Sequence, residues 1–184
     1  MKILRVSNSG IPLNWITPEE ACIFSAKNLI TWHIGDQIKI MRGGISRINN
    51  EQSTIDIFPV IASGNNSGKF KSPILTNPSL FRRDANTCMY CGVVFSDGHL
   101  TRDHVIPLSK NGPNTWNNSV AACKTCNQRK ADRTPEKAKM PLLAVPYTPT
   151  HAEHLILINR TVLYDQMHFL SSYVKSDRMK MYIN

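Results

Sequence analysis

The first 78 residues combine one helical apolar pattern with short apolar runs typical of strands. In residues 18–32 (PEEACIFSAKNLITW) apolar side chains recur at helical intervals. Thr17 precedes this segment as a favoured N-cap residue, and Pro18 stands at the first helical position. The runs typical of strands are ILRV, IKIM and STIDIFPVIAS, at residues 3–6, 38–41 and 53–63. The pattern therefore predicts a small sheet with one helix in an N-terminal α/β region.

The middle of the chain, residues 79–146, has a different order. HLTRDHVIP alternates toward an apolar end and predicts a short strand, and LSKNGPNTW has the Ser, Asn, Gly and Pro content of a loop. NNSVAACKTCNQRKAD predicts a turn that leads into a helix. The predicted fold class is therefore α+β, and strand, loop and helix meet with Asp103 and His104 on one side and Asn127 on the other.

The remaining segment, residues 147–184, is predicted to form a C-terminal helical extension. Leu155, Ile158, Val162 and Met167 approximate one apolar stripe, and two prolines separate this segment from the domain before it. Such a helix would pack on the core or pair with a second subunit. The pattern therefore leaves a homodimer open.

Charge and hydropathy narrow the choice of partners. The net charge is +9, and residues 79–140 alone carry ten Lys or Arg against five Asp or Glu. A basic balance attracts polyanions, and we expect nucleic acid rather than a membrane surface because no basic amphipathic helix stands out. No apolar run approaches the roughly 18–20 residues of a membrane span, and the N-terminus lacks the apolar stretch of a secretory signal. We therefore expect a cytoplasmic protein that does not associate with membranes.

Four of the five cysteines form two C-x2-C pairs, Cys88 with Cys91 and Cys123 with Cys126. A cytoplasmic chain has little use for disulfides, so the pattern favours a metal, and four thiolates fit a tetrahedral structural Zn²⁺ site. Thirty-one residues lie between the two pairs, more than the roughly 15–20 of an ordinary zinc ribbon. Because the inserted residues include the doublet Asp-His, the zinc site either belongs to a binding module or frames a reactive site.

The ordered motifs of the central domain resemble the HNH endonuclease family. The resemblance rests on C-x2-C, LTRDHVIPLSKNG and TWNNSVAACKTCNQRKADRTPEKAKM, in which the Asp-His doublet, a middle Asn, the second C-x2-C pair and a terminal N-x-x-K follow in order. It covers about residues 79–146. The N-terminal ILRVSNSGIPLNWITPEEACIFSAKNLITW also resembles a region that precedes the module in one bacterial branch of the family. The resemblance implies a ββα-metal fold and hydrolysis of phosphodiester bonds.

The resemblance implies catalytic roles at four positions. His104 would be the general base that takes a proton from the attacking water, a task suited to an imidazole. Asp103 and Asn127 would hold one divalent metal, Mg²⁺ or Mn²⁺, through oxygen ligands. Asn118 would hydrogen-bond across the loop and hold its two halves in register without touching the metal. A second interpretation of Asn127 is that it links the helix of the zinc site to its neighbours.

Basic residues near this helix and before the first cysteine pair are candidate nucleic-acid contacts. The resemblance favours Lys130 as a contact to a phosphate group. At helical spacing the basic side chains cannot all face one way, so only some of them would touch DNA. The candidates are Lys124, Arg129, Lys130, Arg133, Arg82 and Arg83. Such contacts position a nucleic acid and give salt-sensitive affinity without reading its sequence.

Two function classes follow from these observations. The first is a metal-dependent HNH endonuclease that nicks or cuts DNA, of restriction, phage or mobile-element origin. The second is a zinc-stapled nucleic-acid-binding protein without catalysis. The intact Asp103, His104 and Asn127 favour the nuclease. Cleavage of RNA is an alternative because DNA and RNA share the same phosphodiester chemistry.

Overall fold

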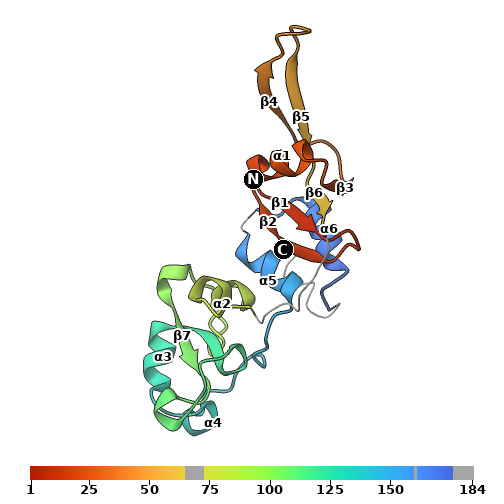
Figure 1. Ribbon diagram of the computed structural model, residues 1–184. Helices are drawn as coiled ribbons and strands as arrows, with labels where there is room; N and C mark the ends of the chain where they lie inside the picture. The colour runs from red at the N-terminus through yellow and green to blue at the C-terminus, as the bar shows by residue number, and fades with distance from the viewer. Residues whose placement is uncertain (65–72, 160, 176–184) are drawn as a thin grey trace. The chain divides into compact units, whose positions relative to one another are not determined.

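The computed structural model describes residues 1–64, 73–159 and 161–175, which form two compact units. Unit 1 contains residues 1–64, 159 and 161–175, and unit 2 contains residues 73–158. Each unit combines strands with helices, as Figure 1 shows. The predicted mixed α and β fold class is therefore confirmed.

Unit 1 is built on a four-stranded sheet in the order β2-β1-β6-β3. β1 pairs antiparallel with β2 and parallel with β6, and β6 pairs antiparallel with β3. The strands are β1 (Ile3–Val6), β2 (Pro12–Ile16), β3 (Ile30–Ile34) and β6 (Val60–Ser63). The buried core of this unit consists of Ile3, Ile16, Ala21, Ile57 and Ile61.

Helix α1 (Pro18–Ala26) begins where the sequence predicts but ends early. The Thr17 hydroxyl accepts a hydrogen bond from the Glu20 amide at 3.2 Å, and Glu20 Oε2 accepts one from the Thr17 amide at 2.7 Å, which together form a capping box. Asn28 has a φ of +52°, a left-handed conformation that ends the helix. The prediction of one helix over 18–32 is therefore wrong in its second half, where the chain enters β3.

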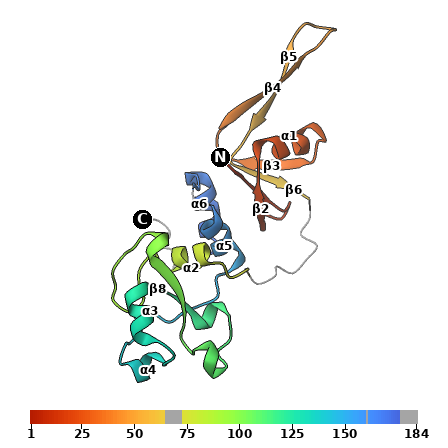
Figure 2. The ribbon, with the colours of Figure 1, turned by 90° about the vertical axis from the view of Figure 1, so that its left-hand side faces the viewer.

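A separate two-stranded hairpin, β4 (Lys39–Ile45) and β5 (Gln52–Ile57), projects from the sheet of unit 1 (Figures 1 and 2). The run predicted as one strand over 53–63 is divided between this hairpin and β6. Pro59 lies at the break and has no amide hydrogen to donate to a strand ladder. Its carbonyl instead accepts a hydrogen bond from the Leu4 amide at 2.9 Å.

Unit 2 contains a strand, strand and helix in sequence, β7 (Leu100–His104), β8 (Ser119–Cys123) and α3 (Lys124–Lys130). The two strands pair antiparallel, and α3 follows β8 without a loop (Figure 2). The other helices are α2 (Asn77–Arg83), α4 (Pro135–Ala138) and α5 (His151–Ile158), with 3₁₀ turns at Asp97–His99, Leu108–Lys110 and Trp116–Asn118. The buried core consists of Leu80, Phe81, Leu100, Trp116 and Ala121.

The C-terminal apolar stripe forms two short helices, α5 in unit 2 and α6 (Tyr164–Ser171) in unit 1. Gln166 anchors α6, because its Nε2 donates hydrogen bonds to the carbonyls of Lys2 and Pro59, both at 2.8 Å. Its Oε1 accepts from the Leu163 amide at the start of the helix. None of the helices in the described ranges has the length and apolarity that a membrane crossing requires.

Candidate functional site

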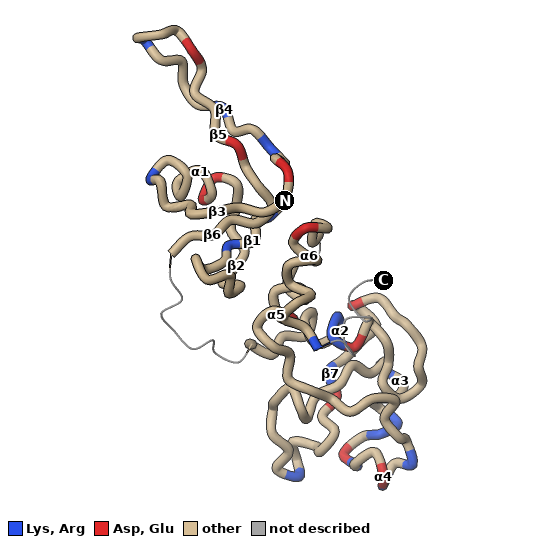
Figure 3. The backbone as a smooth tube through the Cα atoms, turned by 90° about the vertical axis from the view of Figure 1, so that its right-hand side faces the viewer, with Lys and Arg blue, Asp and Glu red and all other residues tan. Residues whose placement is uncertain are grey.

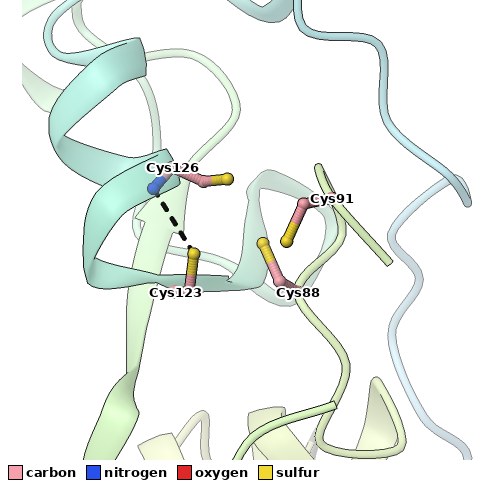
Figure 4. Close-up of side chains that lie close together, drawn as sticks. All are labelled: Cys88, Cys91, Cys123 and Cys126. Carbon is pink, nitrogen blue, oxygen red and sulfur yellow. Dashed lines mark hydrogen bonds between the residues drawn. The ribbon is translucent and has the colours of Figure 1, made fainter. Parts of the chain in front are cut away.

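The four cysteines of the two C-x2-C pairs converge in unit 2 (Figure 4). Cys88 and Cys91 come from the turn that follows α2, and Cys123 and Cys126 come from the junction of β8 and α3. All four sulfur atoms lie within 4.8 Å of one another. A tetrahedral site with Zn–S bonds of about 2.3 Å needs sulfur atoms roughly 3.8 Å apart. The predicted cysteine cluster is therefore confirmed, and it fits Zn²⁺.

The protein itself stabilises a thiolate in this cluster. Burial raises the pKa of Cys88, but hydrogen bonds with the backbone of Cys123, Cys91 and Tyr90 outweigh burial and lower that pKa to about 7. Burial, followed by the neighbouring sulfur atoms, raises the pKa of Cys126. The second thiolate therefore needs the charge of a bound cation, which is the usual way in which structural zinc couples to thiol deprotonation.

A cavity of about 200 Å³ opens where β7, α3 and the loop after β7 meet. Three of the residues predicted for catalysis, Asp103, His104 and Asn127, line this cavity. The other lining residues are Arg102, Pro107, Leu108, Lys130 and Ala131. Residues that carry a carboxylate, an imidazole and a carboxamide thus line one space large enough for a small polar group.

Asp103 is almost completely buried, and both of its carboxylate oxygens have partners. Lys130 Nζ donates to Oδ1 at 3.0 Å and also to the His104 carbonyl at 2.8 Å. The Tyr90 hydroxyl donates to Oδ2. Burial, then the hydrogen bond and the charge of Asp103, raise the pKa of Tyr90, so this phenol remains a donor. Lys130 and Tyr90 together fix the carboxylate at the cavity wall.

His104 is half-buried at the end of β7, and its ring contacts Asn114 in the loop between β7 and β8. His104 Nε2 lies 3.1 Å from Asn114 Oδ1. Arg102 NH1 donates to the same oxygen at 3.0 Å. Arg102 also donates from Nε to Asn77 Oδ1 at 2.9 Å. The imidazole therefore belongs to a hydrogen-bonded group on one face of β7.

Asn118 does not line the cavity but closes the loop beside it. Its Oδ1 accepts a hydrogen bond from the Ile106 amide at 2.8 Å. Its Nδ2 donates to the carbonyls of Ile106 and Pro113, at 3.0 and 2.8 Å. Gly112 packs so closely in this loop that an added Cβ would lie 1.8 Å from the Ile106 carbonyl oxygen. These bonds join the two ends of the loop between β7 and β8.

Asn127 connects α3 to β7. Its Nδ2 donates to Thr101 Oγ1 at 2.9 Å, which turns its amide oxygen away from that hydroxyl. A second hollow, lined by Thr101, Lys124, Asn127 and Gln128, shares Asn127 with the cavity. The same side chain thus links the helix to the strand and presents an oxygen atom for another partner.

Two of the predicted nucleic-acid contacts are buried, and the prediction is corrected for them. The side chain of Lys130 is 0% exposed because its ammonium group is enclosed between Asp103 and the His104 carbonyl. Arg83 is 1% exposed, forms an ion pair with Asp84 at 2.8 Å and donates to three backbone carbonyls. Both cations are used inside the fold, so neither is presented to a phosphate.

The other predicted contacts are more accessible. Lys124, Arg129 and Arg133 are exposed on α3 or directly after it. Figure 3 shows basic positions along α3 and α4, with acidic positions among them near α4. Arg82 is half-buried and donates to the Leu157 carbonyl. Candidates for binding a polyanion in unit 2 are therefore concentrated at α3.

Tyr90 contacts Asp103 and Asn114 contacts His104, while Arg102 contacts Asn114. These three residues are not predicted from the sequence. Tyr90 lies between the cysteines of the first pair, and Arg102 lies two positions before His104, on the same face of the strand. This two-residue spacing could have identified Arg102 as a neighbour of His104. The contacts of Tyr90 and Asn114 depend on how distant segments fold together.

Comparisons with known proteins bear on this region. Residues 88–143 match the family model described as HNH endonuclease. Among solved structures, the chain is similar to the Type II-C Cas9 enzyme from Actinomyces naeslundii, with 21% identity and a TM-score of 0.29, over 60% of this chain and 14% of that chain. No curated protein matches the chain. The resemblance predicted from the motifs of the central domain is confirmed over residues 88–143, which match the HNH endonuclease family model.

Proposed function

We propose that this protein is a metal-dependent endonuclease that hydrolyses phosphodiester bonds of DNA. One observation carries the proposal: Asp103, His104 and Asn127 line a single cavity within a module of the HNH endonuclease family. Each residue type suits the reaction, because an imidazole can take a proton and two oxygen ligands can hold a hard cation. The basic residues at α3 support a polyanionic substrate.

His104 is the general base in this proposal. A water molecule beside the imidazole gives up a proton to it as the water oxygen attacks the phosphorus atom. The bond between phosphorus and the 3′ oxygen breaks, and the leaving oxygen takes a proton from solvent. The hydrogen bond between His104 Nε2 and Asn114 Oδ1 restrains the imidazole ring, so less ordering is left for the reaction itself.

Asp103 and Asn127 are the proposed ligands of Mg²⁺ or Mn²⁺. A carboxylate has about four lone-pair sites, and Lys130 and Tyr90 occupy one on each oxygen of Asp103. A site with one carboxylate fits Mg²⁺, which keeps several waters and shares its ligands with substrate phosphates. Bound there, the ion would supply positive charge to the phosphate and the leaving oxygen.

Lys124, Arg129 and Arg133 are the proposed contacts to the DNA backbone. Lys124 lines the hollow that shares Asn127 with the cavity, so a strand held there would pass the proposed reaction site. Backbone contacts of this kind confer affinity that falls as the salt concentration rises. They carry no sequence information, and a target sequence would need other residues to read it.

The proposal is tested by incubating the purified, zinc-loaded protein with supercoiled plasmid and Mg²⁺ or Mn²⁺, with and without a chelator. We expect conversion to open-circular or linear plasmid that requires the added metal. A single-stranded RNA of equal length tests the substrate class. Preferential cleavage of the RNA would assign a ribonuclease, and binding of both substrates without cleavage would leave a nucleic-acid-binding protein.

A further inference from the structure

Two side chains on one face of β7 meet at a single oxygen atom. Arg102 and His104 alternate with Asp103 along β7, so their side chains share a face of the strand. Arg102 NH1 lies 3.0 Å from Asn114 Oδ1, and His104 Nε2 lies 3.1 Å from the same atom. The carboxamide of Asn114 therefore bridges the guanidinium and the imidazole.

The guanidinium identifies which atom of the carboxamide faces the strand. Arginine only donates hydrogen bonds, so the Asn114 atom that it contacts must be the oxygen and not the amide nitrogen. A carboxamide oxygen only accepts, so His104 Nε2 must carry a hydrogen to complete its own contact. In a neutral imidazole the other nitrogen then has no hydrogen. Nδ1 is consequently the nitrogen that can accept a proton.

Arg102 also restrains Asn114, which would be poorly fixed without it. Asn114 is exposed and lies in the loop between the two strands, where a neutral side chain would sample several rotamers. The guanidinium is anchored by Asn77 Oδ1 at 2.9 Å and by the Leu75 carbonyl at 3.4 Å. Its contact with Asn114 is charge-assisted and thus stronger than a bond between neutral groups.

We propose that Asn114 and Arg102 are positioning residues that fix the orientation of the His104 ring and hold its hydrogen on Nε2, so that Nδ1 takes the proton from the attacking water. This inference rests on the proposed nuclease function. Neither residue touches the reacting atoms, and both act through the imidazole.

The test compares three variants of the full-length protein. Asn114→Leu removes the acceptor oxygen at nearly constant volume, and Asn114→Asp keeps an acceptor at the same position. Asn117→Leu is the matched control, because Asn117 is an exposed residue of the same loop that accepts a hydrogen bond from Thr148 instead. Plasmid cleavage is measured at saturating metal to separate kcat from KM.

We expect Asn114→Leu to lower kcat by about 10- to 100-fold, the usual cost of losing a residue that orients a functional group, with KM nearly unchanged. Asn114→Asp should retain much more of the wild-type kcat, and Asn117→Leu should match wild type. The spectroscopic test uses ¹⁵N-labelled histidine, with the signals of His104 assigned by their loss in His104→Ala. These signals should report hydrogen on Nε2 in the wild-type protein and a mixture of both tautomers in Asn114→Leu.

The outcomes separate this inference from the function on which it rests. If the wild-type protein cleaves no nucleic acid, the proposed function fails, but the tautomer measurement still tests the positioning. If the wild-type protein cleaves DNA and Asn114→Leu keeps both its kcat and its tautomer, the positioning role is overturned while the nuclease stands. Hydrogen on Nδ1 in the wild-type spectrum would also overturn it.

Discussion

Replacing Lys130 with methionine should strongly destabilise unit 2. The ammonium group donates to Asp103 Oδ1 at 3.0 Å and to the His104 carbonyl at 2.8 Å, and the side chain is 0% exposed. Hydrogen bonds from a charged group contribute about 1.5–3 kcal/mol each. Breaking a buried ion pair from one side costs about 3–5 kcal/mol, because the remaining charge is left uncompensated. The Tyr90 hydroxyl still donates to the carboxylate in this variant. We therefore expect a loss of stability at the lower end of this range, about 3 kcal/mol.

The assay is urea denaturation of the zinc-loaded full-length protein, with hydrogen exchange measured in peptides that span β7, β8 and α3. Exchange in these peptides reports unit 2 separately from unit 1. Lys124→Met is the matched control because Lys124 is an exposed lysine of the same helix, and surface substitutions usually stay within about 0.5 kcal/mol. The double variant Asp103→Leu with Lys130→Met should be more stable than Lys130→Met alone, since it leaves no unpaired carboxylate.

The two interpretations of Lys130 differ in a second measurement. If Lys130 contacted a phosphate, its replacement would reduce the slope of log affinity against log salt concentration by about one. It would cause little loss of stability. We expect that behaviour for Lys124→Met and not for Lys130→Met. Wild-type stability in Lys130→Met together with a reduced salt slope would refute the buried role and restore the phosphate contact.

Three further predictions follow from the site. His104→Ala should reduce plasmid cleavage by about 10²- to 10⁴-fold, the contribution of a general base, while circular dichroism and DNA binding stay near wild type; unchanged cleavage would exclude His104 as the base. Replacing any one of the four cysteines with serine should give unfolded or insoluble protein, because structural zinc sites contribute roughly 10–16 kcal/mol in small modules. Metal analysis of the wild-type protein should find about one zinc per chain, and brief mild chelation should stop cleavage before that zinc is lost. Zinc-free protein that melts normally would contradict this prediction. Tyr90→Phe should keep the zinc but lower the cleavage rate by about 10- to 100-fold, because the carboxylate of Asp103 loses a donor that orients it. Equal cleavage rates for Tyr90→Phe and wild type would show that this hydrogen bond is not needed.

The sequence predicts local structure best where one residue type determines it. The start of α1 follows from Thr17 and Pro18, whose preferences are local. The end of α1 does not follow from the apolar pattern, because residues after Asn28 join a sheet whose other strands lie far away in the sequence. The run over 53–63 shows the same limit, since its two halves pair with different strands.

The candidate site residues can be predicted for a similar reason. Cysteine spacing and the Asp-His doublet are local patterns, and they identify residues that the fold brings to the zinc cluster and the cavity. Lys130 was misassigned because a terminal lysine on a basic helix resembles a surface contact. Asn127 and Lys130 are three residues apart and therefore lie on one helical face, and that face packs against β7. Only the packing of helix on strand shows that this lysine is enclosed.

The zinc cluster and the cavity are connected through the partners of Asp103. Tyr90 belongs to the turn that carries the first cysteine pair, and Lys130 belongs to the helix that begins at the second pair. A metal that joins the two pairs holds both donors of this carboxylate at fixed positions, and it also holds Asn127 on the same helix. The long insertion between the pairs supplies β7 and thus Asp103 and His104. Each segment that the metal would join supplies one side chain that holds the carboxylate of Asp103. The long spacing between the cysteine pairs is therefore explained if the zinc site is the frame of the reactive site.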